Sequence, residues 1–441
     1  MGYGSFSASL TWALGIGYLT SAYFVCYIVH LSIATGIVLS LVISCLLTGA
    51  TLRGTRTRRP MTGHTQEARV YTYLRAAALC CAALPVVIMT WMSVRSPLAG
   101  WDGWSIWAFK GVAFAQGGPP MSYFRDPTTL HTHPDYPLNL PLAESILFHL
   151  PTPFALPLAT LLGPACFAAL LCIFYAGLAR IYGLLFAAVG TAILATIPIF
   201  VDNVPAGGAD VPLCLYAGGA ATYLLVCWTR GEIRDAVLAA LLAGGAAWTK
   251  KEGLAIAVVI LGVAVVYEVV ARRRNHGVSF GRRIAALCTA CAIPLHWFLF
   301  VRMQHPLPRD FDPVTVTTLG NHLDRLPHLV VLVGQQMVTW GNWGAFWIVL
   351  GCAIVWNGRR LAAPGRALAA LLATQVGVYV VVFVFSNWQP YDAHAQGTLD
   401  RLLLQATPLA VLVLLACVHR SACAGAIHQT PSDGVDGVVP A

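Results

Sequence analysis

The sequence predicts an all-α polytopic membrane protein, on three observations. The 441-residue chain is 58% hydrophobic and only 10% charged, with a mean hydropathy of +0.70. Apolar runs of about 20 residues, the length that crosses a bilayer as a helix, recur from one end of the chain to the other. Clusters of arginine separate many of these runs, which is typical of cytoplasmic loops in membrane proteins. This composition excludes a soluble domain of the same length.

The apolar runs, taken in order, predict about twelve membrane-spanning helices in one domain, residues 1–420. Residues 6–52 are long enough to cross twice, and we expect the first run to be a retained anchor and not a signal peptide. Further spans are expected near residues 71–95, 154–179, 183–201, 211–228, 236–249, 254–270, 284–301, 367–385 and 402–418, with one more helix before Arg359. The Gly-rich tail, residues 421–441, is expected to be disordered.

This number of crossings places the arginine-rich loops on one side of the membrane. They include the cluster of Arg53, Arg56, Arg58 and Arg59. The positive-inside rule makes their side, together with both termini, cytoplasmic. The net charge of +9 arises largely from these loops and does not indicate nucleic-acid binding. The thirteen cysteines lie almost entirely within apolar spans, so no disulfides are indicated.

The opposite, extracytoplasmic side is expected to carry two larger loops, residues 96–153 and 302–328. The first contains a polar and aromatic segment, residues 101–141, in which carboxylates, histidines and a lysine gather in a chain that has few charges. We interpret this first loop as an active-site loop that carries juxtamembrane helices.

A repeat of large side chains begins the active-site loop. Trp101, Trp104, Trp107 and Lys110 recur at every third residue. This spacing predicts one side of a helix that lies in the membrane interface. Asp102 stands at the start of this helix, where it either caps the helix or faces a substrate.

Ionisable groups recur in four outer segments whose apolar surroundings make charge costly. They are Asp102, Asp210, the adjacent Lys250, Lys251 and Glu252, and Arg401. Plainer interpretations exist: a helix cap for Asp210, a solvated turn for the Lys-Lys-Glu sequence, and an interfacial side chain for Arg401. However, the chain has only three lysines, and two of them lie together in one of these segments.

Carboxylates and cations together at the outer membrane edge suit group transfer from a phosphate-activated lipid. The carboxylate removes a proton from the incoming nucleophile, and the cations stabilise the leaving phosphate. No glycine-rich phosphate loop occurs, which argues against a cytoplasmic nucleotide as the donor. His131 and His133 alternate as metal ligands can, but no partner cluster accompanies them in the sequence, so no metal site is predicted.

Five short motifs, in their order, resemble the GT-C superfamily of integral-membrane glycosyltransferases. They are WDGWSIWAFK, HPDYPLNLPL, GGADVPL, WTKKEGL and DRLLLQATPL. The resemblance covers most of residues 71–418 and is closest to the branch that contains protein O-mannosyltransferases and the aminoarabinose transferase of lipid A. It implies a GT-C-like fold. Where the mannosyltransferases have a pair of acidic residues, this chain has Asp102 followed by Gly103.

The resemblance also implies roles for the polar residues. Asp102 is expected to be the general base, and Asp210 a second carboxylate that orients the acceptor or binds a divalent cation. The expected ligands of a polyprenyl phosphate are Lys250, Lys251 and Arg401. Further substrate contacts are expected from Glu252, His133, Asp135, Trp101 and Trp104.

The expected function is transfer of a sugar from a polyprenyl-phosphate donor to a glycan, lipid or protein acceptor. The site of transfer is expected on the extracytoplasmic side of a bacterial-type inner membrane. No cofactor is assigned, and a divalent cation remains open. The alternative is a polytopic transporter or lipid flippase, for which the two short apolar segments on either side of TKKEG are the one favourable feature.

Overall fold

The computed structural model describes residues 3–29, 38, 69–117, 123–151, 153–272, 280–289, 292–303 and 310–427. Within these ranges the fold is helical, and the β-structure consists of one antiparallel bridge between Phe311 and Ser386. The second predicted span and the arginine cluster at residues 53–59 lie outside these ranges.

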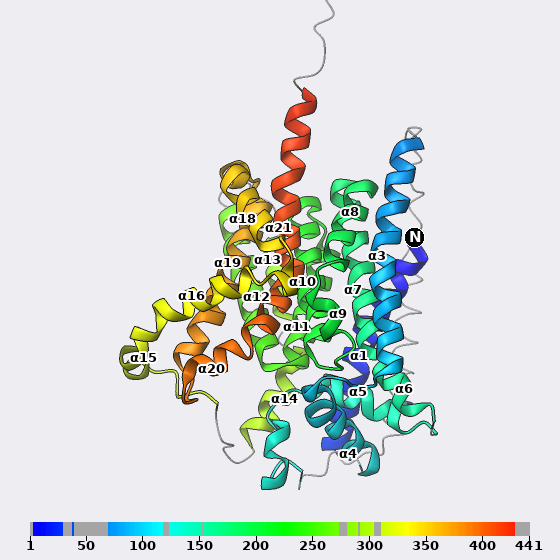
Figure 1. Ribbon diagram of the computed structural model, residues 1–441, viewed down its shortest axis with the longest axis vertical. Helices are drawn as coiled ribbons and strands as arrows, with labels where there is room; N and C mark the ends of the chain where they lie inside the picture. Colours follow the sequence, from blue (N-terminus) through cyan, green and yellow to red (C-terminus); the bar gives the residue numbers. More distant parts are fainter. Residues whose placement is uncertain are drawn as a thin grey trace, which may run out of the picture.

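The first half of the chain forms a bundle and a group of short helices below it (Figure 1). Its helices are α1 (Tyr3–Ile28), α3 (Arg69–Arg95), the π-helix η1 (Gly103–Ala108), α4 (Phe109–Gly117), the 3₁₀-helix η2 (Pro127–Thr132), α5 (Asn139–Phe148), α6 (Ala155–Thr160), α7 (Leu162–Tyr182), α8 (Leu184–Ala195), α9 (Ile199–Asn203) and α10 (Asp210–Arg230).

The second half completes the bundle and adds the helices drawn at the left of Figure 1. Its helices are α11 (Ile233–Thr249), α12 (Lys251–Arg272), α13 (Phe280–Cys288), α14 (Ala292–Arg302), α15 (Val316–His322), η4 (Leu323–Arg325), α16 (Leu326–Met337), α17 (Trp340–Trp343), α18 (Phe346–Asn357), η5 (Gly358–Arg360), α19 (Ala363–Val384), α20 (Tyr391–Gln396) and α21 (Leu399–Ile427).

Seven of the described helices are long and apolar enough to cross a membrane. They are Ala8–Ile28, Arg69–Arg95, Ala155–Tyr182, Asp210–Arg230, Lys251–Ala271, Ala363–Val384 and Leu399–His419. The prediction of a helical membrane protein is supported in this form, and the count of about twelve spans stays a prediction. Helix α21 continues to Ile427, seven residues into the segment predicted as a disordered tail, and residues 428–441 lie outside the described part.

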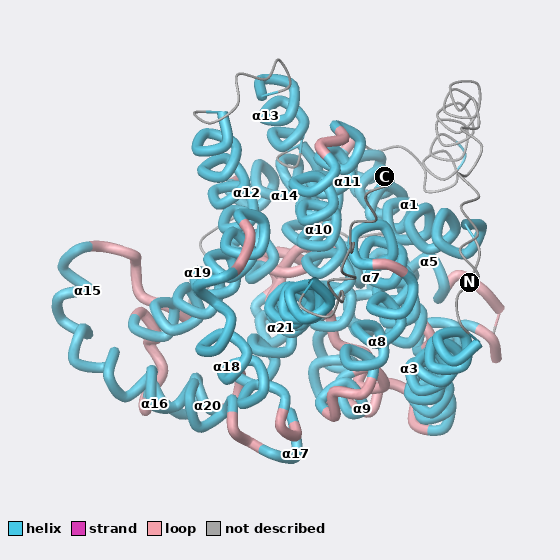
Figure 2. The backbone as a smooth tube through the Cα atoms, turned by 90° about the horizontal axis from the view of Figure 1, so that it is seen from above, coloured by secondary structure: helices cyan, strands magenta, loops and turns pink. Residues whose placement is uncertain are grey.

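Helix α10 forms the core of the bundle and is buried along its membrane-length segment. Viewed from above, α21 lies near the centre with α7, α8, α10 and α19 around it (Figure 2). Close packing here depends on Gly218, since a Cβ atom at this position would lie 2.6 Å from Cβ of Pro408 in α21. Small residues have this role at helix contacts in lipid, where packing drives association.

Arginines gather at one end of this bundle, where α7 and α10 end and α11 begins. Arg180 forms two hydrogen bonds with the Asp235 carboxylate, at 2.7 and 2.8 Å. Arg230 donates to the backbone carbonyl of Arg180, and Arg283 donates to that of Gly231. Because a 21-residue helix is about 30 Å long, Arg230 and Asp210 mark opposite ends of α10.

Helices α11 and α12 form a tight antiparallel hairpin with its turn at Lys250. Helix α11 begins near the arginine end, where Asp235 meets Arg180, and α12 returns to the same end, where Glu268 meets Arg283. Lys250 has extended backbone angles, φ −155° and ψ 157°. The turn requires Gly253, because a Cβ atom there would lie 1.9 Å from the carbonyl oxygen of Ala246. The two short apolar segments around TKKEG are therefore separate helices joined by a turn.

The predicted active-site loop, residues 96–153, contains η1, α4, η2 and α5, and the described part of the second loop, residues 302–328, contains α15 and η4. The prediction that Trp101, Trp104, Trp107 and Lys110 share one side of a helix is wrong. The first two are 68% and 50% exposed, whereas the last two are 1% and 0% exposed. The physical reason is η1, because a π-helix turns less per residue than an α-helix and three-residue spacing then fails to keep side chains in line.

Candidate functional site

The four polar segments singled out in the sequence meet at the end of the bundle opposite the arginines. Asp102 follows α3, Asp210 begins α10, Lys250 forms the α11–α12 turn, and Arg401 lies in the first turn of α21. The short helices α4, α5 and α14 surround the same end of the bundle (Figure 1). We call this group of residues the polar site.

Asp102 and Arg401 form the first ion pair of the polar site. The guanidinium Nη1 of Arg401 contacts Oδ2 of Asp102, and about a third of each side chain is exposed. Asp102 makes no side-chain cap to the helix that follows it. Of its two interpretations, the structure rules out the helix cap and leaves the carboxylate facing the polar site.

Asp210 and Lys250 form the second ion pair, which is almost fully buried. Nζ of Lys250 lies 2.9 Å from Oδ1 of Asp210 and 3.1 Å from Oε1 of Glu252. The side-chain amide of Gln405 donates to the same Asp210 oxygen at 2.6 Å. Asp210 is thus held by side chains from the α11–α12 turn and from α21. Burial makes this pairing essential, because a buried charge that loses its partner costs about 3–5 kcal/mol.

Helix α21 links the two ion pairs. Arg401 and Gln405 are four residues apart, so they lie on the same face of α21. The first contacts Asp102 and the second contacts Asp210. Arg401 also interacts electrostatically with both carboxylates. One helix face therefore holds both carboxylates in a single site.

The HPDY segment of the active-site loop forms a third part of the polar site. Lys251 contacts the Asp135 carboxylate, and its Nζ lies 5.0 Å from the centre of the Tyr136 ring. The His133 ring stacks on Tyr136, with 4.7 Å between ring centres, and its Nδ1 is 3.7 Å from Asp310. Burial lowers the pKa of His133 below its ordinary value, and this effect outweighs the opposing effect of the Asp310 carboxylate.

Lys110 lies beneath this segment and is fully buried. Its Nζ donates to the backbone carbonyl of His133 at 3.0 Å and lies 5.0 Å from the centre of the Trp107 ring. Burial, together with the nearby charge of Lys251, lowers the pKa of Lys110 to about 7. Glu144 is also buried, its Oε2 has no hydrogen-bond partner, and burial raises the pKa of its carboxyl well above the usual value.

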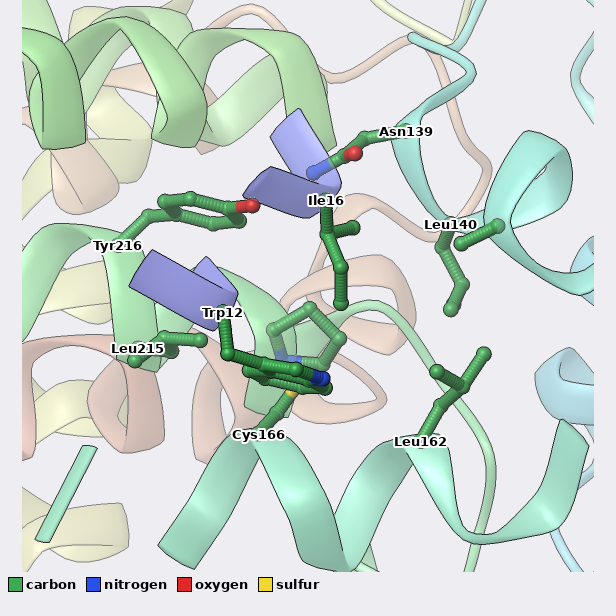
Figure 3. Close-up of a pocket in the computed structure, with 10 residues that line it drawn as sticks. Trp12, Ile16, Asn139, Leu140, Leu162, Cys166, Leu215 and Tyr216 are labelled. Atoms are coloured by element: carbon green, nitrogen blue, oxygen red, sulfur yellow. The ribbon is translucent and has the colours of Figure 1, made fainter. Parts of the chain in front are cut away.

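A hydrogen-bonded chain fixes the end of α11 just before Lys250. The indole of Trp248 donates to Thr20 at 2.9 Å, the Thr20 hydroxyl donates to Asn139 at 2.7 Å, and the Asn139 amide donates to Thr249 at 3.0 Å. Asn139 also lines a small, mostly apolar cavity with Tyr216 (Figure 3). At about 20 Å³ this cavity has room for one water molecule and none for a sugar.

No group of three or more His, Cys, Asp or Glu side chains in the described ranges is arranged to hold a metal ion. Asp210 and Glu252 both contact the ammonium group of Lys250. His131 is exposed in the loop, where its Nδ1 contacts the carbonyl of Thr128.

Trp101 and Trp104 lie on the surface beside Asp102 and pack edge to face, with 4.7 Å between ring centres. Gln405, Tyr136 and Asp310 also lie in the polar site, although their sequence context predicted no role for them. A detectable signal existed for Gln405, which interrupts the apolar sequence LLLQATPL of a membrane-length helix. No protein family, curated protein or solved structure that we compared with the chain matches it.

Proposed function

We propose that this protein is a membrane glycosyltransferase that takes a sugar from a polyprenyl-phosphate donor and transfers it to an acceptor outside the cytoplasm. One observation carries the proposal. Two carboxylate–cation pairs, Asp102 with Arg401 and Asp210 with Lys250, meet at one end of a bundle of membrane-length helices. Bases and phosphate-binding cations are the two kinds of group that this reaction needs.

The proposed orientation follows from the arginines at the other end of the bundle. Arg180, Arg230 and Arg283 contact one another's segments there. The positive-inside rule makes an arginine-rich end cytoplasmic, which puts the polar site on the outer side. A polyprenyl-phosphate sugar in the outer leaflet would then have its phosphate level with the lysines and Arg401.

Exchange of ion-pair partners is the central step of the proposed mechanism. The donor phosphate attracts Arg401, whose planar guanidinium can bind two phosphate oxygens at once. This exchange releases Asp102 from its ion pair and leaves a carboxylate beside the sugar. Lys250 stays paired with Asp210, which holds its ammonium group in place for the phosphate.

The sugar-transfer step uses the side chains of Asp102, Arg401 and Lys250. The acceptor's hydroxyl oxygen forms a bond to the anomeric carbon of the sugar, and its proton goes to the Asp102 carboxylate. The bond between the anomeric carbon and the phosphate oxygen breaks, and its electron pair stays on the phosphate. Arg401 and Lys250 stabilise the charge that develops there. The products are the glycosylated acceptor and polyprenyl phosphate.

The alternative, a transporter or lipid flippase, had one supporting feature in the sequence. The segments around TKKEG could have been a helix broken at mid-membrane, as in many transporters. They are instead two antiparallel helices joined at Lys250. This geometry favours the transferase.

The test is sugar transfer by the purified protein in detergent, from a radiolabelled polyprenyl-phosphate sugar to a membrane extract that supplies acceptors. We expect label in a covalent product that forms together with unlabelled polyprenyl phosphate. Counterflow of solute into proteoliposomes without any covalent product would contradict the transferase and favour transport.

A further inference from the structure

A cleft lies between the end of α16 and the start of α21, the helix that also carries Arg401 of the polar site. It has a volume of about 360 Å³ and is lined by Leu332, Gln335, Gln336, Thr339, Gln396 and Leu399. Its volume lies at the lower end of the range for small-molecule sites in proteins, which is about 300–1,000 Å³. We call it the glutamine cleft.

The chemistry of the glutamine cleft is polar and uncharged. Three primary amides and one hydroxyl line it, together with two leucines, and the lining contains no charged side chain. An amide both donates and accepts hydrogen bonds, as a hydroxyl group does. A phosphate or a carboxylate would find no cation in this cleft, and an ammonium group would find no anion.

A hydrogen bond holds one of the polar side chains that line the glutamine cleft. The Thr339 hydroxyl lies 3.4 Å from the amide oxygen of Gln336, which directs the NH₂ group of that amide elsewhere. Gln335 and Gln396 are exposed, and they come from the two different helices that form the sides of the cleft. Leu332 and Leu399 are buried and supply an apolar surface.

The glutamine cleft is also close to the proposed chemistry. Leu399 precedes Arg401 by two residues in α21, a rise of about 3 Å along the helix axis. Gln396 ends α20, the short helix that leads into α21. A ligand in the cleft therefore contacts the first turn of α21, and Arg401 leaves this same turn on another side, about 200° around the helix, to meet Asp102.

We propose that the glutamine cleft binds a neutral, hydroxyl-rich glycan and that this glycan is the acceptor. The proposal rests on the glycosyltransferase function proposed above and narrows its acceptor from a glycan, lipid or protein to a neutral glycan. The amides match sugar hydroxyls, the leucines match the apolar face of a sugar ring, and the absence of charge in the lining disfavours acidic glycans and charged peptides.

The first test is binding without donor. Purified full-length protein in detergent is applied to an array of neutral oligosaccharides, sialylated oligosaccharides and basic and acidic peptides. We expect binding to neutral oligosaccharides, weakened about 30-fold in the variant with both Gln335→Leu and Gln396→Leu, which is the loss of two ordinary hydrogen bonds. The matched control is Gln116→Leu, because Gln116 is an exposed glutamine of α4 outside the cleft. Preference for sialylated glycans or peptides, or equal binding by the double variant, would overturn the proposal.

The second test separates this proposal from the proposed function. Without acceptor, a transferase slowly passes the donor sugar to water, and this reaction is followed by release of polyprenyl phosphate. We expect the double variant to keep this reaction while its transfer to the best neutral glycan falls about 30-fold. If the wild type releases no polyprenyl phosphate under any condition, the transferase function fails and the acceptor assignment falls with it. If the wild type turns over and the variant transfers equally well, only the glutamine cleft proposal is wrong.

Discussion

Arg401 and Asp102 are ion-paired across 299 positions of sequence, and this contact brings the last membrane-length helix against the start of the active-site loop. Both side chains keep about a third of their surface exposed. An ion pair with this exposure is screened by solvent and contributes no more than about 1 kcal/mol to stability. Its partners can therefore separate at low cost, as exchange of Arg401 onto a phosphate requires.

We predict that Asp102→Asn abolishes transfer and leaves the fold intact. Asparagine has the size of aspartate but cannot accept the acceptor's proton, and loss of a general base slows an enzyme by about 100-fold or more. Transfer of radiolabel and thermal unfolding are measured on the same preparations. The matched control is Asp202→Asn, since Asp202 is an exposed carboxylate in α9. Normal turnover by Asp102→Asn would remove Asp102 from the mechanism.

Arg401→Lys tests whether the planar guanidinium group of Arg401 binds the donor phosphate. Lysine keeps the positive charge that Asp102 pairs with, but it presents a point charge that cannot bind two oxygens in a plane. We expect the KM for the donor to rise about tenfold or more, with a smaller change in kcat, and little change in unfolding temperature. Arg302→Lys is the control, because Arg302 is exposed at the end of α14. An unchanged donor KM would show that Arg401 serves only to hold Asp102.

The sequence predicted much of the helical order because apolar length is a local property. The predicted spans at residues 71–95, 211–228 and 254–270 correspond closely to α3, α10 and α12. The candidate residues were found by a local signal too, since charge at the edge of an apolar run is unusual wherever it occurs. Asp102 and Arg401, chosen separately from segments far apart, turned out to be in contact.

Which side chains pair, and whether a helix is of the α or the π type, could not be predicted in this way. Both depend on neighbours that the sequence does not reveal. Nothing local to Asp210 shows that Gln405 donates to it from another helix. The burial of Trp107 and Lys110 depends on a π-helix, and the three-residue spacing of the large side chains does not predict one. In the same way, the turn at Lys250 requires Gly253 only because Ala246 lies against it.

The buried pair of Asp210 and Lys250 predicts non-additive mutations. Either Asp210→Asn or Lys250→Met leaves a buried charge without its main partner and should destabilise the protein by about 3–5 kcal/mol. The variant with both changes removes both charges, so we expect it to recover a large part of that loss, and we expect no recovery of transfer. Chemical denaturation of the three variants gives the coupling energy. Additive losses would mean that the two side chains act independently.

Lys110 predicts a dependence of stability on pH near neutrality. Burial lowers its pKa to about 7 in the folded protein, whereas the ordinary value is 10.5. Between these two values the unfolded chain binds a proton that the folded protein does not, so the free energy of unfolding rises with pH across that window. Below about pH 7 Lys110 is protonated in both the folded and the unfolded state. The stabilisation that is complete above pH 10.5 is then lost.

The variant Lys110→Met has no proton to bind at this position. We therefore expect the unfolding temperature of the wild type, relative to this variant, to rise from pH 7 to pH 10 and to stay level below pH 6. A constant difference from pH 6 to pH 10 would mean that the buried amine keeps its proton, held by the Trp107 ring and the carbonyl of His133.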